Sequence, residues 1–470
     1  MQQKRKKILL ISDDLRLHSG VGNISKEIVL NTAHHFDWVQ IGGAINHPDA
    51  GKRLDLSQET NKLLGINDSS VFVYPVNGYG DAMFLRQIID LEKPDALFLI
   101  TDPRYFTWLF AIENEIRKKI PITYLNIWDS LPFPVWNKPY YESCDALFGI
   151  SKQTVNINKV VLEDKADSKI IKYVPHGLNE NIFYPIDENN DNEYKELKKS
   201  ILKDKYDFAL FFNSRNIRRK QIPDTMLAFK LFLDKLPKEK ADRCVLILHT
   251  QPVDDNGTDL LAVSEYMFGR NNPNIMFSNQ SLSPQQLNYL YNIADGQILL
   301  TSNEGWGLSL TEAILAGTPI IANVQGGMID QMRFTDNDGK WIEYNKDFPS
   351  NHRGTFKTHG EWALPVYPSN ISIQGSPLTP YISDDRCRPE DAAEQIYNLY
   401  NLSREERKAK GLKGREWAMS DEAGFTSKKM ANRVIEGMDG LFNTWSPREK
   451  YELVNANDYK EKSIQHKWEY

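Results

Sequence analysis

The sequence predicts an α/β protein with two domains, each built around a parallel β-sheet. Short apolar runs of strand length alternate with helix-like segments along most of the chain, which is typical of βαβ units. The chain has 470 residues, more than one hydrophobic core usually supports. A polar stretch without hydrophobic periodicity at residues 187–193 divides the apolar runs into two series, and we expect it to link the two domains.

The two series of apolar runs define the expected sheets. In the first half of the chain the expected strands are residues 8–11, 38–41, 71–74, 96–100, 122–126, 146–150 and 171–174. In the second half they are residues 208–212, 245–248, 275–277, 297–300 and 320–322. Two Rossmann-like domains in tandem account for both series most simply, an N-terminal domain at residues 1–188 and a C-terminal domain at residues 189–426.

One segment of the C-terminal domain departs from this pattern. Residues 334–389 are rich in proline, asparagine, serine and aromatic residues, and they predict a long loop-like insertion that is either a lid or a satellite core. Aromatic faces stack on sugars and bases, so Trp362 is a candidate acceptor contact. Helices are expected after the insertion, at residues 389–402, 404–419 and 427–441.

Composition narrows the classes of function. Hydrophobic residues make up 41% and charged residues 26% of the chain, as in ordinary soluble enzymes. The net charge of -6 disfavours a general nucleic-acid or anionic-membrane surface, although local basic clusters keep DNA open as a partner. No apolar run approaches the roughly 20 residues that span a bilayer, so no transmembrane segment is expected.

The cysteines and the acidic clusters predict no metal site. The three cysteines are far apart and lack metal-ligand spacing, which fits a reducing cytoplasm. The triplet Asp336-Asn337-Asp338 precedes Gly339 and is typical of a polar turn. We therefore expect a cytoplasmic protein that needs no metal.

The most informative motif follows the expected strand at residues 297–300. It is an acidic, glycine-rich loop joined to the first turn of a helix, formed by Asn303, Glu304, Gly305, Trp306, Gly307, Leu308 and Glu312. In α/β sheets, ligands bind outside the carboxyl ends of the strands, where glycines admit close backbone approach and a helix N-terminus offers N–H groups to phosphate. The motif therefore predicts a nucleoside diphosphate site whose two glutamates grip opposite ends of the ligand.

A second interpretation applies to part of this motif. The run Ser309-Leu310-Thr311-Glu312 also matches a capping box, in which Glu312 bonds back to the N-cap amide of the helix. Gly317 and Pro319 then end the same helix. In this interpretation Glu312 has no role in binding.

Taken whole, the motif resembles the EGFGL-type, Glu-x7-Glu signature of retaining glycosyltransferases with the GT-B fold, of the family-four-like kind. The resemblance implies two Rossmann-like domains whose parallel sheets face a deep interdomain cleft. It implies that Glu312 binds the ribose of a sugar nucleotide, that Glu304 lies against the transferred sugar, and that the loop residues between them, with Asn303, bind the donor. It also implies that the last helix, at about 427–470, crosses back onto the N-terminal domain.

A basic motif after the expected strand at residues 208–212 adds to the resemblance. Arg215 and Lys220 match the two cations of the family's Gly-Arg…Lys-Gly element, which neutralise the donor diphosphate as negative charge grows on the leaving group. Ser214 and Gln221 stand where glycines are usual, and Ser214 is expected at the donor.

A glycine loop near the start of the chain resembles the family's first-strand loop. Ser19-Gly20-Val21-Gly22 opens a helix after the first expected strand, so Gly20 and Gly22 are expected under the donor phosphates; the alternative is a plain βα turn. The remaining dinucleotide fingerprint, a P-loop lysine motif and kinase elements are missing from the sequence. Their absence disfavours hydride transfer and phosphoryl transfer from ATP.

The acceptor is expected on the N-terminal domain. Many relatives place a histidine after the strand at residues 122–126, whereas this chain has Trp128-Asp129. We interpret Asp129 as a catalytic residue that positions the acceptor hydroxyl or binds a sugar hydroxyl, the alternative being a turn or helix-cap aspartate. Trp128 is a candidate acceptor contact, as are Asp102 and Arg104, which follow an earlier strand.

Together these residues predict a retaining glycosyltransferase that moves a sugar from a nucleoside diphosphate to a hydroxyl acceptor without a metal. The donor base stays open, UDP included, and so does the acceptor, which is a glycan, a small molecule or, less favoured, a hydroxylated base in DNA. Two alternatives share the architecture: a GT-B sugar-nucleotide epimerase and a non-catalytic sugar-nucleotide-binding protein. Hydrolysis of the donor by the purified chain would distinguish binding from turnover.

Overall fold

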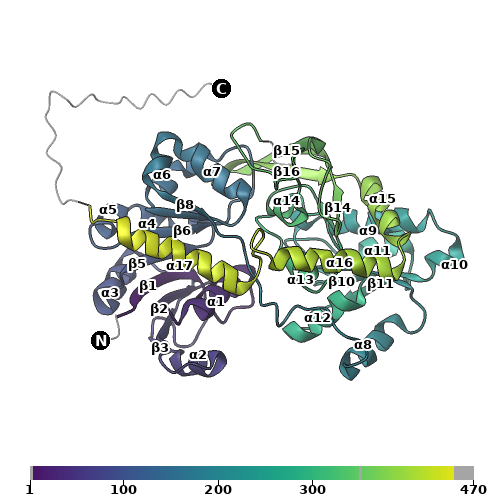
Figure 1. Cartoon of the computed structure of the whole chain (residues 1–470), viewed down its shortest axis with the longest axis horizontal. Coiled ribbons are helices and arrows are strands. Elements are labelled where there is room, and N and C mark those ends of the chain that lie inside the picture. The colour runs from purple at the N-terminus through teal and green to yellow at the C-terminus, as the bar shows by residue number, and fades with distance from the viewer. Residues whose placement is uncertain (1–3, 349–351, 449–470) are drawn as a thin grey trace.

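A computed structural model describes residues 4–348 and 352–448, which form two α/β domains (Figure 1). The N-terminal sheet has eight strands in the order β3-β4-β2-β1-β5-β6-β7-β8. Its strands are β1 (Lys6–Asp13), β2 (Phe36–Gly43), β3 (Leu54–Asp55), β4 (Val71–Pro75), β5 (Ala96–Ile100), β6 (Ile122–Asn126), β7 (Ala146–Gly149) and β8 (Ile170–Tyr173). Neighbours run parallel except β3, which pairs antiparallel with β4.

The C-terminal sheet has six strands, all parallel, in the order β11-β10-β9-β12-β13-β14. Its strands are β9 (Phe208–Asn213), β10 (Cys244–His249), β11 (Ile275–Ser278), β12 (Gly296–Leu299), β13 (Ile320–Asn323) and β14 (Ala363–Val366). A separate antiparallel hairpin consists of β15 (Pro368–Ser376) and β16 (Thr379–Cys387).

Helices connect these strands. The N-terminal domain has α1 (Gly20–Thr32), α2 (Ser57–Leu64), α3 (Ala82–Glu92), α4 (Thr107–Phe110), α5 (Glu113–Ile116), α6 (Lys138–Glu142) and α7 (Lys152–Leu162). The C-terminal domain has α8 (Asn192–Leu202), α9 (Ile222–Leu233), α10 (Lys238–Ala241), α11 (Leu260–Phe268), α12 (Pro284–Ile293), α13 (Leu308–Leu315), α14 (Gly327–Met332), α15 (Pro389–Tyr400) and α16 (Arg404–Met419). Short 3-10 turns are η1 (Pro103–Phe106), η2 (Val135–Asn137), η3 (Glu163–Ser168), η4 (Arg218–Lys220) and η5 (His352–Gly354). Among the described residues, none of these helices is long and apolar enough to cross a membrane.

The central strands explain the apolar runs of the sequence. All five residues of β5 and all five of β6 are buried, because helices cover both faces of a parallel sheet and leave no polar side to the strand. Each strand expected from the sequence is present within one residue of its expected bounds, except β1 and β2, which are two residues longer at each end. The prediction of two parallel-sheet domains is confirmed.

The segment at residues 334–389 corrects the prediction of a loop-like insertion. It contributes β14 to the edge of the C-terminal sheet and then forms the hairpin β15–β16. Both were missed because β14 is short and includes a proline, while β15 and β16 are largely polar. Trp362 precedes β14 and is 5% exposed, so burial in the core replaces its predicted exposure to an acceptor.

The last described helix, α17 (Ser427–Thr444), returns to the N-terminal domain. It packs on α1 and β8, and it lies across the N-terminal domain in Figure 1. Gly437 makes the close approach feasible, because a Cβ at this position would meet the Phe148 ring at 2.4 Å. The rest of the predicted C-terminal segment, from residue 449, lies outside the described residues.

Candidate active site

A cavity of about 480 Å³ opens between the two domains, at the carboxyl ends of their strands. This is where α/β sheets bind ligands. We call it the first cavity, and its wall includes Asp13, Gly20, Ile127, Asp129, Ser214, Arg215, Arg219, Lys220, Glu304, Gly305, Trp306, Gly307, Leu308 and Glu312. Most of the donor-side residues predicted from the sequence therefore lie in one cavity.

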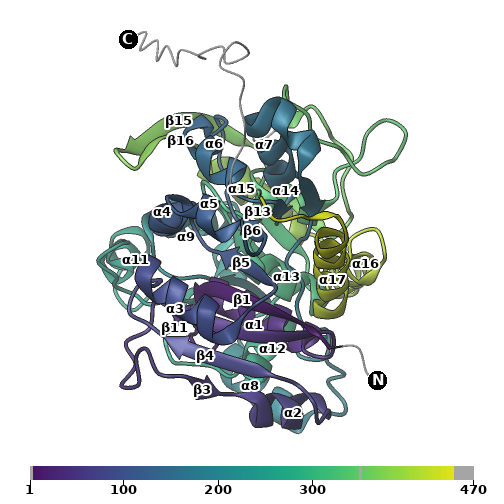
Figure 2. The same ribbon diagram turned by 90° about the vertical axis from the view of Figure 1, so that its left-hand side faces the viewer.

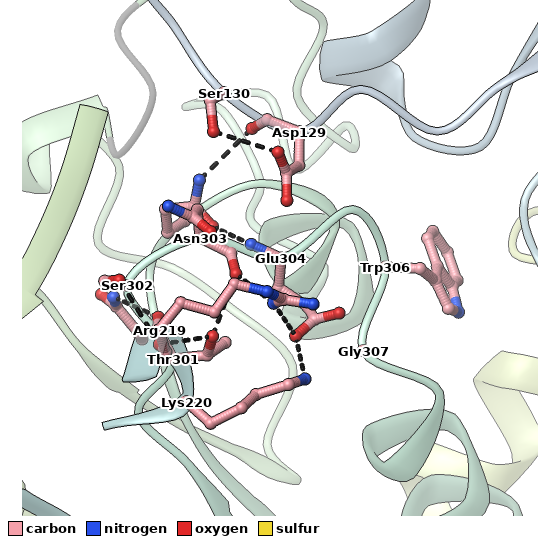
Figure 3. A network of polar contacts seen from close by, with 12 residues as sticks. Asp129, Ser130, Arg219, Lys220, Thr301, Ser302, Asn303, Glu304, Trp306 and Gly307 are labelled. Carbon is pink, nitrogen blue, oxygen red and sulfur yellow. Dashed lines mark hydrogen bonds and ion pairs between the residues drawn. The ribbon is translucent and has the colours of Figure 1, made fainter. Parts of the chain in front are cut away.

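Glu304 lies at the base of this cavity, held by two cations (Figure 3). Arg219 donates from Nη1 to Oε2 at 2.9 Å, and Lys220 forms an ion pair with the same oxygen. Burial opposes ionisation of Glu304, yet Arg219 and Lys220 overcome it and lower the pKa of the carboxyl to about 2. Glu304 is therefore a carboxylate throughout the neutral range.

Glu312 lies on the other side of the glycine loop in a different environment. Its Oε2 accepts from the Tyr291 hydroxyl at 2.5 Å and from Asn213 Nδ2 at 3.3 Å. No cation pairs with it in the described part of the chain, and burial raises its pKa to about 7. The N-cap of α13 is Gly307, without a side-chain capping bond, so the capping-box interpretation of Glu312 is wrong.

The loop between the two glutamates needs its glycines. Gly307 has a φ of +88°, a left-handed conformation that favours glycine, and α13 begins directly after it. A Cβ on Gly305 would lie 2.9 Å from the Ile127 carbonyl oxygen of the other domain. The Trp306 side chain points away from Glu304 (Figure 3), donates to Thr311 at 2.8 Å and is 2% exposed, so this residue offers the cavity mainly its backbone.

The two cations predicted for the donor phosphates differ in position. Lys220 is buried beside Glu304, and this burial lowers its pKa. Arg215 is largely exposed at the rim and pairs with Asp254 at 3.0 Å. Arg219 was not among the predicted site residues, although it immediately precedes Lys220 in the same basic run; its position against Glu304 depends on the turn η4.

The first glycine loop is held by the side chains of Ser19 and Asp13, neither of which was among the predicted site residues. Ser19 caps α1 by accepting from the Gly22 amide at 2.9 Å, and its hydroxyl donates to Asp13 at 2.5 Å. A Cβ on Gly22 would meet the Leu17 carbonyl oxygen at 2.6 Å. Gly20 lines the first cavity, whereas Gly22 serves the turn, which corrects its predicted place at the donor. Asp13 could have been predicted as a site residue, because it ends β1 and ligands bind outside the carboxyl ends of such strands.

A second cavity of about 410 Å³ adjoins the first, and both are lined by Ile127, Asp129 and Arg219. The predicted acceptor residues line it: Asp102, Arg104, Trp128 and Asp129. Asn303 also lines the second cavity, and its predicted contact with the donor stays a prediction.

Asp129 is the carboxylate shared by the two cavities. Burial raises the pKa of its carboxyl, while Arg219 opposes the shift, and its Oδ1 accepts from the Ser130 hydroxyl at 3.0 Å. Trp128 packs edge-on against Trp136 and donates from its indole N–H to the Ser130 carbonyl. Trp128 therefore packs next to Asp129 and stabilises this part of the lining of the second cavity.

Trp362 is not part of either site. Its ring stacks on Trp417 with centroids 5.0 Å apart, and its indole N–H donates to the Gln331 carbonyl at 3.0 Å. Its predicted contact with the acceptor is therefore wrong, because both its apolar face and its polar atom are satisfied inside the C-terminal domain. Trp362 belongs to the main hydrophobic core of the C-terminal domain, so neither a lid nor a satellite core describes this residue.

The acidic triplet near the insertion forms the expected turn. Gly339 donates its amide to the Asp336 carbonyl at 3.1 Å, and Asp338 donates its amide to Asp336 Oδ1 at 2.9 Å. Within residues 4–348 and 352–448, no group of three or more histidine, cysteine, aspartate or glutamate side chains is placed to hold a metal ion.

Comparisons with known proteins agree with this arrangement. Comparison with curated protein sequences finds no match, but many solved structures share the fold. The Anabaena protein HepE, solved with UDP and glucose, has a TM-score of 0.63 at 12% identity, covering 93% of this chain and 100% of HepE. Sucrose-phosphate synthase from Thermosynechococcus elongatus has a TM-score of 0.61 at 15% identity, covering 93% and 100%. An α,α-trehalose-phosphate synthase from Burkholderia vietnamiensis has a TM-score of 0.64 at 10% identity, covering 95% and 100%.

The fold is thus GT-B, with two Rossmann-like domains that face each other across the cavities. Within it, residues 193–347 match the family model of Glycosyl transferases group 1. This matched segment contains the basic run, both glutamates and the glycine loop between them.

Proposed function

We propose that this protein transfers a sugar from a nucleoside diphosphate sugar to a hydroxyl acceptor, with retention of the anomeric configuration. The observation that carries the proposal is the first cavity, which sets Glu304 and Glu312 on opposite sides of one glycine loop, with Lys220 and Arg215 beside them. The match of residues 193–347 to Glycosyl transferases group 1 supports it. So does the structural likeness to HepE, which was solved with UDP and glucose.

In the proposed donor complex, Glu312 accepts hydrogen bonds from the ribose hydroxyls. The diphosphate lies on the backbone amides at the start of α13, where the helix dipole and free N–H groups favour negative charge. Arg215 would leave its exposed ion pair with Asp254 to bind the phosphates, which costs little because surface ion pairs are weak. The sugar then reaches Glu304 at the base of the cavity.

The proposed reaction exchanges one bond at the anomeric carbon. The bond from C1 to the phosphate oxygen breaks, a bond from C1 to the acceptor oxygen forms on the same face, and the acceptor proton passes to the departing phosphate. Arg215, Lys220 and the amides after Gly307 stabilise the charge that develops on the phosphate. Asp129, between the two cavities, orients the acceptor hydroxyl.

A panel of nucleoside diphosphate sugars tests the donor half of this proposal. We expect one donor to bind with a measurable heat by calorimetry, and nuclear magnetic resonance of the product to show the configuration at C1 unchanged. A bound donor that is neither hydrolysed nor transferred would identify a binding protein. Release of a free nucleotide sugar whose sugar has been epimerised would identify an epimerase.

Chelation tests the proposed independence from metals. Because side-chain cations stand beside the leaving group, we expect transfer to continue in excess EDTA at an unchanged rate. Loss of activity on chelation, restored by manganese, would contradict this and direct attention to Asp336 and Asp338.

A further inference from the structure

The hairpin β15–β16 belongs to the C-terminal domain but reaches the N-terminal domain beside α6 (Figure 2). Arg104 donates from Nη1 to the Thr379 hydroxyl at 2.8 Å. The ring of Tyr381 meets Trp136 edge-on, with centroids 4.4 Å apart. A hydrogen bond and an aromatic contact therefore hold the hairpin against loops that follow β5 and β6.

The base of the same hairpin is joined to the loop that carries Glu304. Asp385 donates its amide to the Ser302 carbonyl at 3.0 Å. Asn303 donates from Nδ2 to Asp384 Oδ1 at 2.9 Å. One strand, β16, thus connects the residues just before Glu304 to the N-terminal domain, and a ligand that touches the hairpin lies next to the reacting end of the donor site.

The wall of the second cavity has the chemistry of a site for hydroxyl groups. The hairpin supplies the amide of Gln374 and the hydroxyls of Ser376 and Thr379 to a lining that also includes Asp102, Asp129 and the cations Arg104, Arg218 and Arg219. Amides and hydroxyls both donate and accept, whereas carboxylates only accept, so a molecule with several hydroxyls can satisfy both sides. The volume of about 410 Å³ falls within the roughly 300–1,000 Å³ of small-molecule sites.

Resting on the proposed transferase activity, we propose that the hairpin β15–β16 is the acceptor-selecting wall of the second cavity and that it admits a small polyhydroxylated acceptor of sugar size. Gln374 contacts the acceptor. Thr379 is a positioning residue that holds the wall in register through Arg104. The shared lining at Asp129 and Arg219 places a hydroxyl of this acceptor at the junction with the first cavity.

Direct binding tests this inference without requiring turnover. Protein saturated with UDP is titrated with a panel of pentoses, hexoses, hexose phosphates and disaccharides, and with duplex DNA that contains hydroxymethylated bases. We expect at least one sugar to bind, with its Kd raised about 3- to 10-fold in Gln374→Ala because one hydrogen bond is lost. Thr379→Val should weaken binding of the same sugar to a similar extent. Thr379→Ser keeps the hydroxyl and should bind the sugar with the wild-type Kd.

Two controls separate this inference from the proposed function. Asn370→Ala changes an exposed residue of β15 that lies outside the second cavity and should leave sugar binding unchanged. The Kd for UDP should be the same in every variant; a wild-type protein that binds no nucleotide would instead refute the proposed function itself. Binding of DNA and of no sugar, binding of neither, or equal sugar affinity in wild type and Gln374→Ala would each overturn the assignment of the hairpin.

Discussion

Two glutamates that flank one glycine loop have opposite pKa shifts, which their neighbours determine. Both are buried, and burial alone raises the pKa of a carboxyl. Glu304 has Arg219 and Lys220 against it, which bring its pKa to about 2. Glu312 has only the neutral partners Tyr291 and Asn213, and its pKa rises to about 7. The motif thus contains one carboxylate that is always charged and one whose charge depends on pH and on ligand.

Glu312 should make nucleotide binding depend on pH. A charged carboxylate binds ribose hydroxyls more strongly than a neutral carboxyl, so the affinity for UDP should rise as pH increases from about 5.5 through 7 to 8. Calorimetry at several pH values measures this. Glu312→Gln should weaken UDP binding at pH 8 by roughly 1.5–3 kcal/mol, the contribution of one charge-assisted hydrogen bond. The variant should also lose the pH dependence that ionisation of Glu312 causes. Equal UDP affinity in wild type and variant would leave Glu312 without a binding role.

Removing Lys220 should destabilise the protein mainly by leaving Glu304 short of a partner. Loss of one member of a buried ion pair costs roughly 3–5 kcal/mol, and Lys220→Met should fall at the lower end because Arg219 remains. Adding Glu304→Gln should recover part of the loss, since the charge itself is removed. Urea unfolding at pH 7 measures each variant.

Lys230→Met provides the matched control for Lys220→Met. Lys230, in α9, forms an exposed ion pair with Asp234, and its loss should change stability by less than about 1 kcal/mol.

The stabilisation from Glu304 has a defined pH window. Its folded pKa is depressed, so the contribution is present above about pH 4.5 and is lost as pH falls towards about 2. A Lys220→Met protein as stable as wild type would show that the ion pair contributes nothing.

At the scale of elements, the glycine loop before α13 determines how closely the two domains approach. Gly305→Ala would place a Cβ 2.9 Å from the Ile127 carbonyl oxygen and 3.0 Å from Ile150 Cδ1, both in the N-terminal domain. We expect kcat to fall about 10- to 100-fold, because a small misplacement of reacting groups is costly. The Kd for UDP should change little, since the proposed nucleotide contacts lie on one domain.

Gly440→Ala is the control for that variant. Gly440 lies in α17, and an added Cβ would meet only Ile170 Cδ1, at 3.9 Å, so activity should be retained. If Gly305→Ala keeps full kcat, the two domains need not approach this closely during the reaction. Initial rates with the donor identified from the panel give the comparison.

Strands and the central motif could be predicted from the sequence because their signals are local. Continuous apolar runs indicate strands that are buried on both faces, and the glycines between Glu304 and Glu312 indicate a tight loop. The place of Arg219 and the hairpin β15–β16 could not be predicted in the same way. The first depends on the turn η4, and the second on contacts such as Arg104 with Thr379, which are 275 residues apart. Alternation in the hairpin is weak because much of both strands is exposed.

At the scale of the whole molecule, the two domains are also in direct contact outside the cavities. Asp330, in α14 of the C-terminal domain, accepts from the Lys152 amide at 2.8 Å and from the Tyr173 hydroxyl at 3.0 Å. Both partners belong to the N-terminal domain. Burial raises the pKa of Asp330 to about 7, against the opposing effect of Lys152, with Glu343 also facing the carboxyl. A titrating group therefore lies inside the contact between domains.

This buried carboxyl should make stability fall as pH rises. Above about pH 4 the unfolded chain releases the Asp330 proton, whereas the folded protein holds it until about pH 7, so folding becomes less favourable across that window. The effect cannot exceed about 1.4 kcal/mol per pH unit. Asp330→Asn keeps an oxygen for Lys152 and Tyr173 but cannot ionise, so its Tm should exceed that of wild type at pH 8 and approach that of wild type only below about pH 4. Parallel Tm profiles for the two proteins would show that the pKa of Asp330 is the same in the folded and unfolded states, and that the contact between the domains does not shift it.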